Sequence, residues 1–312
     1  MSRKQQRRRR RHSKLAVAVL ILCLGVLVFS ACFLFIPNRY NHLGDTASSG
    51  TNNSHTASQS GTAQQTDAQA FLAVLEGETA QLEEGNWKSS DKSVAKVDRS
   101  GLVTGVKQGT CQISKKDMAY QVDVRHLEQR ENGTYVDGIL IVNKSYPLSA
   151  DYDPGLQPET KAAFQELCDA AAAEGMDIYD GSDYRDYSYQ VKIYHNYCSL
   201  YGWEKADTFS ARPGYSEHQS GLTIDCNTID DAFGETQEAA WLAEYCADYG
   251  FIIRFPKGKE AITGYKYEPW HIRYVGADVA KEIQKYGLTL EEYLGVDLSL
   301  IHISEPTRHL RI

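Results

Sequence analysis

The stretch RPGYSEHQSGLTIDCN, residues 212–227, places a histidine and an aspartate seven positions apart around a serine–glycine pair. If its LTIDC portion is a strand, Thr223 and Asp225 share one face and Ile224 lies on the other, because successive side chains of a strand point to opposite sides. The apolar face would pack on a core while Asp225 faces a polar site. The stretch therefore predicts a strand that carries a functional residue.

A second stretch, YEPWHIRYVG at residues 267–276, has the same character. As a strand it would point His271 and Arg273 away from its apolar residues. Pro269 favours an extended conformation for Glu268 and argues against a helix there. The helical His-Glu-x-x-His motif of many metalloproteases is absent, so any metal site must be built from two separate segments.

The residue types in these stretches suit a catalytic metal. Two histidines and one carboxylate form a zinc ligand set with one open position, and a glutamate nearby suits a general base. Such a metal lowers the pKa of a bound water and polarises the carbonyl that it faces. A single histidine is more often a surface or hydrogen-bonded residue, but the joint pattern of the two stretches favours the metal site.

Four segments carry a family resemblance. SEHQSGLTID resembles the Ser-x-His-x-x-Gly-x-x-x-Asp motif of VanY-type D-alanyl-D-alanine carboxypeptidases, and EPWHIRYVG resembles their Glu-x-x-His segment. SDYRDYSYQ (182–190) resembles their Tyr-Arg-Ser segment, and LIVNKSYPLSADYDP (140–154) their entry strand. The match spans residues 138–297 in the right order. It implies an α+β zinc peptidase domain of the hedgehog/DD-peptidase-like fold.

The resemblance also implies roles for single residues. It assigns three ligands to Zn2+: His218, Asp225 and His271. Glu268 would be the general base, and Arg185 would hold a substrate carbonyl or stabilise the oxyanion. Ser216 and Gln190 are further candidates for substrate contact.

The chain departs from the family pattern at two positions. Asp186 stands where the family usually has serine, and Thr223 where it usually has alanine. We expect Asp186 to weaken the attraction of Arg185 for a substrate carboxylate, which affects specificity more than activity. Arg212 and Arg273 also lie near the motifs, and both substrate binding and a structural role are open to them.

An all-β segment precedes the peptidase-like region. Residues 70–125 contain short runs of alternating apolar and polar residues separated by glycine and Ser-Asp turns, which is typical of strands. WKSSDKSVAKVDRSGLVTGVKQGTCQIS (87–114) resembles the bacterial Ig-like group 2 domain. The resemblance implies a small β-sandwich that spaces or docks a partner domain.

The N-terminal region predicts a membrane anchor. Residues 1–14 hold eight Lys and Arg and no acid, and residues 15–36 carry no charge over a length that spans a bilayer as a helix. The positive-inside rule keeps the basic end in the cytoplasm and places the rest outside, in a single-pass arrangement. A cleaved signal peptide is the alternative. Residues 37–69 are polar and small and read as a disordered linker.

Three helices are expected in the peptidase-like region, at residues 158–175, 187–202 and 236–250, with strand-like runs between and after them. LSLIHISEPTR begins at Leu298 and resembles the translation of a sequencing-library adapter. We therefore expect residues 298–312 to be an artefact and leave their histidines out of the ligand count.

These features predict a membrane-anchored zinc carboxypeptidase, outside the cell, that removes the terminal D-Ala from peptidoglycan stem peptides. Cleavage of D-Ala-D-Ala is favoured, and an L,D-carboxypeptidase acting on tetrapeptides, an endopeptidase and a non-catalytic wall-binding protein are the alternatives. The net charge of −8, with the basic residues of the tip set apart, does not suit nucleic-acid binding. Seven cysteines are present, and their pairing cannot be read from the sequence.

Overall fold

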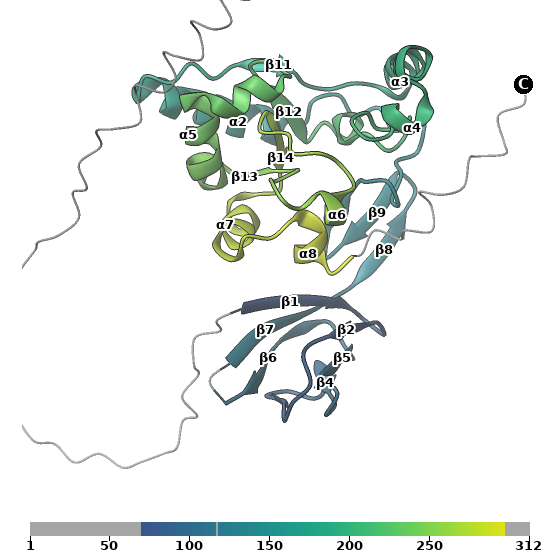
Figure 1. Cartoon of the computed structure of the whole chain (residues 1–312), viewed down its shortest axis with the longest axis vertical. Coiled ribbons are helices and arrows are strands. Elements are labelled where there is room, and N and C mark those ends of the chain that lie inside the picture. The colour runs from purple at the N-terminus through teal and green to yellow at the C-terminus, as the bar shows by residue number, and fades with distance from the viewer. Residues whose placement is uncertain (1–69, 117, 297–312) are drawn as a thin grey trace, which may run out of the picture. The chain divides into compact units, whose positions relative to one another are not determined.

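The computed structural model describes residues 70–116 and 118–296, which all belong to one compact unit (Figure 1). The predicted basic tip, membrane anchor and linker lie outside the described residues, as does the predicted adapter-derived segment. Within the described ranges no helix is both long enough and apolar enough to cross a membrane.

The N-terminal part of the described chain is a β-sandwich. One sheet has the strand order β1-β7-β6-β3 and the other β2-β5-β4. The strands are β1 (Ala70–Leu75), β2 (Thr79–Gln81), β3 (Lys88–Ser89), β4 (Ala95–Val97), β5 (Leu102–Gly105), β6 (Gly109–Lys115) and β7 (Met118–Arg125). The predicted all-β segment is therefore confirmed as an Ig-like fold.

The alternation of side chains explains the core of this sandwich. Ile113 of β6 and Val122 of β7 are fully buried between the sheets, together with Val103 of β5 and the ring of Trp87. β6 and β7 form a long antiparallel hairpin whose register pairs Cys111 with Val122. Each strand thus places one apolar face inside, as the sequence pattern predicted.

A small antiparallel sheet follows the sandwich, with the order β10-β9-β8. Its strands are β8 (Leu127–Arg130), β9 (Gly133–Val136) and β10 (Ile139–Ile141). β10 is the entry strand recognised in the sequence, and its Leu140 and Ile141 are buried. The sequence did not predict β8 and β9.

The central sheet of the peptidase-like part is antiparallel, with the order β11-β12-β14-β13. These strands are β11 (Asp180–Ser182), β12 (Thr223–Cys226), β13 (Phe251–Ile253) and β14 (His271–Tyr274). β12 and β14 are neighbours, and their register pairs Thr223 with Arg273 and Asp225 with His271. Directly opposed residues of an antiparallel pair lie on the same face of a sheet, so both polar pairs share one face.

The other face of this sheet is apolar. Ile224 and Cys226 of β12 and Ile272 of β14 are fully buried there, against the helices α2 and α5 (Figure 1). The helices of this part are α2 (Pro158–Ala173), α3 (Tyr187–Tyr201), α4 (Trp203–Ala206), α5 (Gln237–Tyr245), α6 (Glu260–Thr263), α7 (Ala277–Tyr286) and α8 (Leu290–Leu294), with 3-10 turns η1 (Glu217–Ser220), η2 (Asp231–Glu235) and η3 (Cys246–Tyr249). The layer of helices supports the sheet from behind and leaves its polar face open to a site.

The three helices expected from the sequence are present. α2 begins at Pro158 and is followed by Gly175 in a left-handed conformation. α3 begins after Asp186, whose side chain accepts a hydrogen bond from the backbone N–H of Tyr189 at 2.6 Å. The third predicted helix is divided in the structure into α5 and η3, whereas α7 and α8 were not predicted.

The strand β1 and the last two helices share an apolar cluster. Phe71 stacks on Tyr293 of α8 with ring centroids 5.6 Å apart, and Arg125 donates to the Tyr293 carbonyl at 2.7 Å. Arg125 also pairs with Asp123 at 2.9 Å. The Ig-like sandwich is thus in direct contact with α8.

The turn between η1 and β12 requires glycine. Gly221 has φ 68°, and a Cβ added there would lie 2.0 Å from the Gly155 carbonyl oxygen. We expect Gly221→Ala to lower the free energy of unfolding by about 1–3 kcal/mol, since it adds a clash to a strained backbone. Urea denaturation measures the change.

Gly258→Ala is the matched control, because Gly258 has φ 83° but nothing within 4 Å of the added Cβ. The Gly258→Ala variant has only the left-handed backbone strain and no clash, so its free energy of unfolding should fall by less than that of Gly221→Ala. Equal losses for the two variants would contradict the proposed clash at Gly221.

Candidate metal centre

Three short elements bring the two sequence motifs together. η1 carries His218, β12 carries Asp225, and β14 begins at His271. Gly221 ends η1 in a left-handed conformation and turns the chain into β12. The register of β12 and β14 then sets Asp225 opposite His271. Residues far apart in the sequence therefore meet on the polar face of the central sheet.

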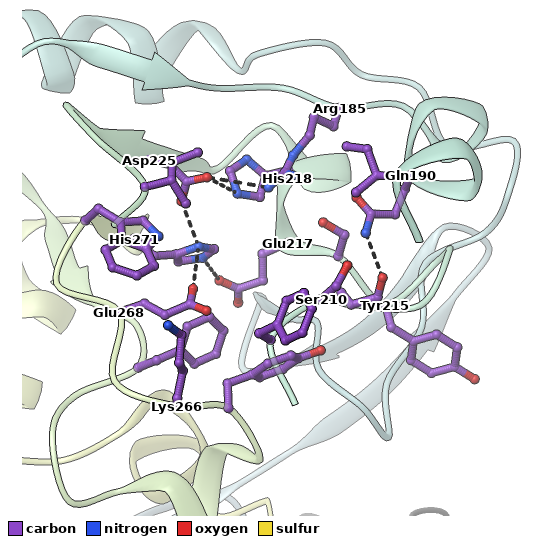
Figure 2. Close-up of a pocket in the computed structure, with 18 of the residues that line it drawn as sticks. Arg185, Gln190, Ser210, Tyr215, Glu217, His218, Asp225, Lys266, Glu268 and His271 are labelled. Carbon is purple, nitrogen blue, oxygen red and sulfur yellow. Dashed lines mark hydrogen bonds and ion pairs between the residues drawn. The ribbon is translucent and has the colours of Figure 1, made fainter. Parts of the chain in front are cut away.

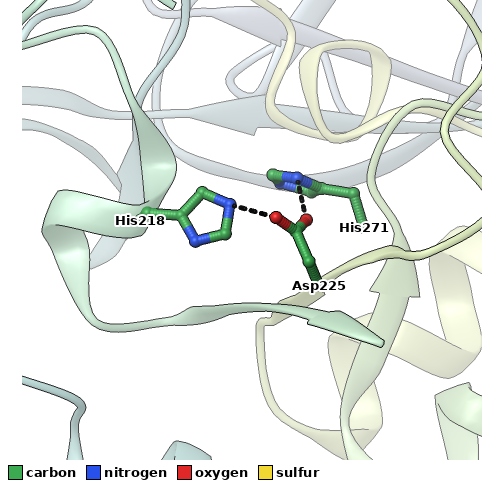
Figure 3. Close-up of side chains that lie close together, drawn as sticks. All are labelled: His218, Asp225 and His271. Atoms are coloured by element: carbon green, nitrogen blue, oxygen red, sulfur yellow. Dashed lines mark ion pairs between the residues drawn. The ribbon is translucent and has the colours of Figure 1, made fainter. Parts of the chain in front are cut away.

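The side chains of His218, Asp225 and His271 form a compact, buried group (Figure 3). Each offers one ligand atom, and these atoms lie within 4.8 Å of one another. His218 Nε2 is 3.2 Å from Asp225 Oδ2, and His271 Nδ1 is 3.1 Å from Asp225 Oδ1. The two imidazole rings are nearly perpendicular, with centroids 5.1 Å apart. The structure thus brings together all three predicted ligands.

The donor atoms of this group fit a zinc ion. His218 Nε2 and Asp225 Oδ1 are buried and make no well-aligned hydrogen bond within the described residues, and their close contacts are to other members of this group. Unsatisfied buried polar atoms are costly, and a cation between them would satisfy both. Two imidazole nitrogens and one carboxylate are a ligand set that zinc accepts, with a position left for water or substrate.

The second nitrogen of each histidine has its own partner. His218 Nδ1 is 2.6 Å from the Asp183 carbonyl oxygen, and His271 Nε2 is 3.5 Å from Glu217 Oε2. Burial, together with the nearby Arg185 guanidinium, lowers the pKa of His218 and so favours its neutral, metal-binding form. His218 is therefore arranged to present Nε2 to the site, and His271 to present Nδ1.

The protonation of Asp225 and His271 also depends on their burial and on the charged groups beside them. Burial disfavours the charged form of Asp225, but His218 and His271 hold its pKa well below the usual range. Burial also acts against a charged His271, but the nearby carboxylates of Asp225 and Glu217 raise its pKa to about 9. In the absence of a metal the ring therefore binds a second proton, which a metal ion at Nδ1 would replace.

Glu268 lies beside this group without belonging to it. Its Oε2 is 3.7 Å from His271 Nδ1, and the side chain is buried. Burial raises the pKa of Glu268 to about 7. A carboxylate that exchanges protons near neutral pH, next to the open side of a metal site, has the properties of a general base.

A cavity of about 430 Å3 opens in front of the metal ligands (Figure 2). Arg185, Gln190 and Ser216, the three predicted substrate contacts, all line it. Arg185 approaches Asp225 at 3.5 Å, and its Nε is buried and free of a hydrogen-bond partner within the described ranges. Gln190 donates to the Ala211 carbonyl oxygen at 2.6 Å, which leaves its Oε1 without a partner there as well. Two polar atoms of residues that line the cavity are thus buried without a hydrogen-bond partner in the described part of the chain.

Arg212 and Arg273, whose roles the sequence left open, and Asp186 all have structural partners. Arg212 pairs with Asp207 at 2.6 Å. The Asp186 side chain caps α3, and none of the ion pairs found in the described residues joins it to Arg185. The expectation that Asp186 weakens Arg185 has no support in a direct contact. Arg273 donates to the Leu140 carbonyl oxygen and lies on the polar face beneath the site.

A buried charge cluster beneath the metal centre was not predicted. Its four members are almost inaccessible to solvent: Glu217, Arg254, Arg273 and Glu291. Arg254 bridges the two carboxylates, at 2.8 Å from Glu217 and 2.6 Å from Glu291. The two arginines hold the pKa of Glu217 well below its usual range, against the effect of burial. Only the position of Glu217 next to His218 could have drawn attention to it.

Comparisons with known proteins agree with this geometry. Residues 153–277 match the family model VanY, described as D-alanyl-D-alanine carboxypeptidase, and residues 51–117 match the bacterial Ig-like domain (group 2). The putative carboxypeptidase YodJ of Bacillus subtilis is 35% identical over 251 residues, which cover 71% of this chain and 92% of YodJ. A D-alanyl-D-alanine carboxypeptidase of Enterococcus faecalis is 36% identical over 51% of this chain and 66% of its own length.

Two solved structures resemble the chain in sequence and in fold. The LdcB LD-carboxypeptidase and DacB from Streptococcus pneumoniae D39 are each 46% identical, with a TM-score of 0.51 over 55% of this chain. The alignments cover 95% and 96% of those proteins. This chain therefore belongs to the VanY family of D-alanyl-D-alanine carboxypeptidases, a family of zinc metallopeptidases, and carries an Ig-like domain before its peptidase fold.

Proposed function

We propose that this chain is a zinc-dependent carboxypeptidase that removes the terminal D-Ala from peptidoglycan stem peptides, with D-Ala-D-Ala as the favoured bond. One observation carries the proposal: three buried ligand atoms surround a space for a cation, and the carboxylate of Glu268 stands beside it. When bound, zinc would supply an activated water and polarise the scissile carbonyl.

The residues of the chain then have separate tasks. His218, Asp225 and His271 hold the ion and are themselves oriented by their outer hydrogen bonds. Glu268 takes a proton from the attacking water and gives it to the leaving amine. The burial of its side chain shields this proton transfer from bulk solvent and raises the pKa of Glu268 to about 7.

Substrate binding falls to the polar groups of the cavity. A carboxypeptidase must neutralise a terminal carboxylate or stabilise the developing oxyanion, and the guanidinium of Arg185 suits either task. Gln190 Oε1, which lacks a partner within the described ranges, would accept from a substrate N–H, and the buried Ser216 lines the same cavity. Arg212 is already paired with Asp207, so Arg185 is the arginine that we assign to the substrate.

The L,D-carboxypeptidase alternative has a specific observation in its favour. The LdcB and DacB structures are more similar in sequence than the Enterococcus faecalis relative, and LdcB is described as an LD-carboxypeptidase. The alternative differs from the first proposal in the residue before the scissile bond, which is D-Ala in the pentapeptide and a different, L-configured residue in the tetrapeptide. A purely wall-binding protein would have no need of the buried base Glu268.

We further propose that the peptidase acts at the outer face of the cell membrane. The support is the sequence pattern of residues 1–36, a basic tip followed by an uncharged stretch, together with the location of stem peptides outside the membrane. The Ig-like sandwich would then lie between the anchor and the peptidase fold.

The direct test uses two synthetic stem peptides. We expect the purified chain to shorten either the pentapeptide or the tetrapeptide by one alanine, and a chelator to stop the reaction, because metal removal takes away the activated water. Mass spectrometry identifies the products, and added zinc should restore activity.

The substrate that shortens decides between the two bonds. Loss of D-Ala from the pentapeptide supports D,D-cleavage, and loss from the tetrapeptide supports L,D-cleavage. A chain that binds zinc and cuts neither peptide would overturn the carboxypeptidase proposal and favour an endopeptidase or a binding protein. Activity that persists at full rate with chelator would overturn the metal mechanism.

A further inference from the structure

Glu217 stands directly beneath the metal ligands with its carboxylate enclosed by protein. The side chain is 4% exposed and lies one position before His218 in the chain. Its two oxygens have different partners. Oε1 accepts from Arg254 Nε at 2.8 Å and from an Arg273 terminal nitrogen at 2.6 Å.

The other oxygen faces the metal centre. Oε2 lies 3.5 Å from His271 Nε2 and 3.4 Å from Thr223 Oγ1, which donates to it. Figure 2 shows this side of the carboxylate directed at the His271 ring. Thr223 is one of the two departures from the family pattern, so in this chain a hydroxyl adds a second contact to the oxygen that faces His271.

His271 is a ring with two distinct edges. Nδ1 points to Asp225 and Glu268, at 3.1 and 3.7 Å, and so faces the space for the cation. Nε2 points the opposite way, to Glu217. A histidine can bind a metal through one nitrogen only while the proton sits on the other, and a hydrogen-bond acceptor at that other nitrogen selects this tautomer.

We propose that Glu217 is a positioning residue for the metal centre: it accepts the Nε2–H of His271 and thereby holds the ring with Nδ1 free for the cation. Arg254 and Arg273 stabilise the negative charge of this carboxylate. Both donate to Oε1, the oxygen that does not contact His271. The inference rests on the proposed function, since it assigns the outer partner of a zinc ligand, and Glu217 itself contacts neither metal nor substrate.

The comparison with His218 shows why this task falls to Glu217. The outer nitrogen of His218 is 2.6 Å from a backbone carbonyl, that of Asp183, which no substitution removes. For His271 the acceptor is a side chain. Of the outer partners that the described residues give the two histidine ligands, that of His271 is the one that a substitution can remove.

A rival explanation gives Glu217 a purely electrostatic role. Two buried arginines need buried carboxylates, and Glu217 would then only compensate their charge. Glu291 separates the two explanations. It is fully buried, pairs with Arg254 through both oxygens at 2.9 and 2.6 Å, and accepts from Asn143 at 3.1 Å. It has no contact with His271 among its hydrogen bonds and ion pairs in the described residues.

Glu217→Gln has a definite consequence for the hydrogen bonds. Arg254 and Arg273 are both donors, so the amide oxygen of the new side chain must face them. Its NH2 group then faces His271 Nε2, where it meets the N–H of the metal-binding tautomer donor to donor. The variant should thus oppose the metal-binding form of His271 and not merely remove a charge.

The test measures zinc affinity by competition with a chromogenic chelator, on the full chain. We expect Glu217→Gln to raise the zinc Kd about 10–100-fold, the usual cost of losing an outer partner of a metal ligand. Glu291→Gln, the matched control, should leave the zinc Kd unchanged, although both variants lower the urea midpoint. Equal zinc affinities for Glu217→Gln and the wild type would overturn the proposal, as would equal weakening by the two variants.

A second measurement on the wild-type chain does not depend on the folding of a variant. In the zinc-loaded protein labelled with 15N-histidine, His271 should show a metal-bound Nδ1 and a protonated Nε2. A metal-bound Nε2 would overturn the proposal. Failure of the proposed function is distinguishable, because it appears as a wild-type chain that binds no zinc or cuts no stem peptide, whatever Glu217 does.

Discussion

Glu268→Gln is expected to lower kcat on stem peptides by about 10²–10⁴-fold, the usual contribution of a general base, while zinc remains bound. The amide keeps the size and shape of the side chain but cannot accept a proton from the attacking water. Glu268 is not one of the three grouped ligand atoms, and its nearest contact to them is 3.7 Å, at His271 Nδ1. Metal binding and turnover should therefore separate in this variant.

The measurement combines kcat from product release with the zinc content of the purified variant. Glu235→Gln is the control, because Glu235 is an exposed carboxylate at the end of η2 and should be silent. Normal turnover in Glu268→Gln would remove Glu268 from the mechanism. Loss of zinc together with activity would instead make Glu268 a fourth ligand, which contradicts the open position that we assign.

Much of this site could be predicted because its signals are local. Alternation along β12 predicted that Asp225 and Ile224 lie on different faces of the sheet. The structure shows Ile224 fully buried on the apolar face. Pro269 correctly indicated that Glu268 is not in a helix, since β14 begins only at His271. Strand periodicity and proline geometry act over two or three residues, so a sequence displays them directly.

The pairing of the two motifs could not be derived in the same way. Asp225 and His271 are opposed because of the register of β12 and β14, which depends on how the whole sheet assembles. The residue types of the two stretches and the family resemblance, not the spacing, implied that these residues meet. The roles of the individual residues remain predictions until variants are measured.

The buried charge cluster is the feature that could least be predicted from the sequence. Glu217 meets Arg254, which is 37 positions away in sequence, and Arg273, which is 56 positions away. In the sequence Glu217 and Arg254 resemble ordinary surface charges, and Arg273 is noted only for its place near a motif. Their burial is intelligible only after the fold brings opposite charges together, because an unpaired charge in such a place would be prohibitive.

The contact between the Ig-like sandwich and α8 was missed for a similar reason. The sequence suggested a module that spaces or docks a partner, and no local signal joins Phe71 to Tyr293. In the structure these rings stack, and α8 also carries Glu291 of the charge cluster. The sandwich thus packs against α8, the helix that contributes Glu291 to the charge cluster beneath the metal centre.

His218→Ala is expected to lose both zinc and activity. Removing this imidazole leaves one histidine and one carboxylate, and two protein ligands are fewer than the three that catalytic zinc sites use. His218 Nε2 is 3.2 Å from Asp225 Oδ2, itself a proposed ligand, so loss of this nitrogen breaks no contact found in the described residues outside the metal site. The zinc content after dialysis, in ions per chain, and kcat on the stem peptides measure the two losses.

His195→Ala separates loss of the ligand from loss of a histidine. His195 is exposed on α3, outside the group of three ligands, and its replacement should leave zinc content and kcat unchanged. Far-UV circular dichroism of both variants tests that each is folded. Zinc at full stoichiometry in a folded His218→Ala chain would remove His218 from the ligand set, whereas loss of zinc with an intact fold would assign it. In His218→Ala the strands β12 and β14 still supply Asp225 and His271, but η1 supplies no ligand. The same experiment therefore tests whether the site needs η1 as well as the two strands.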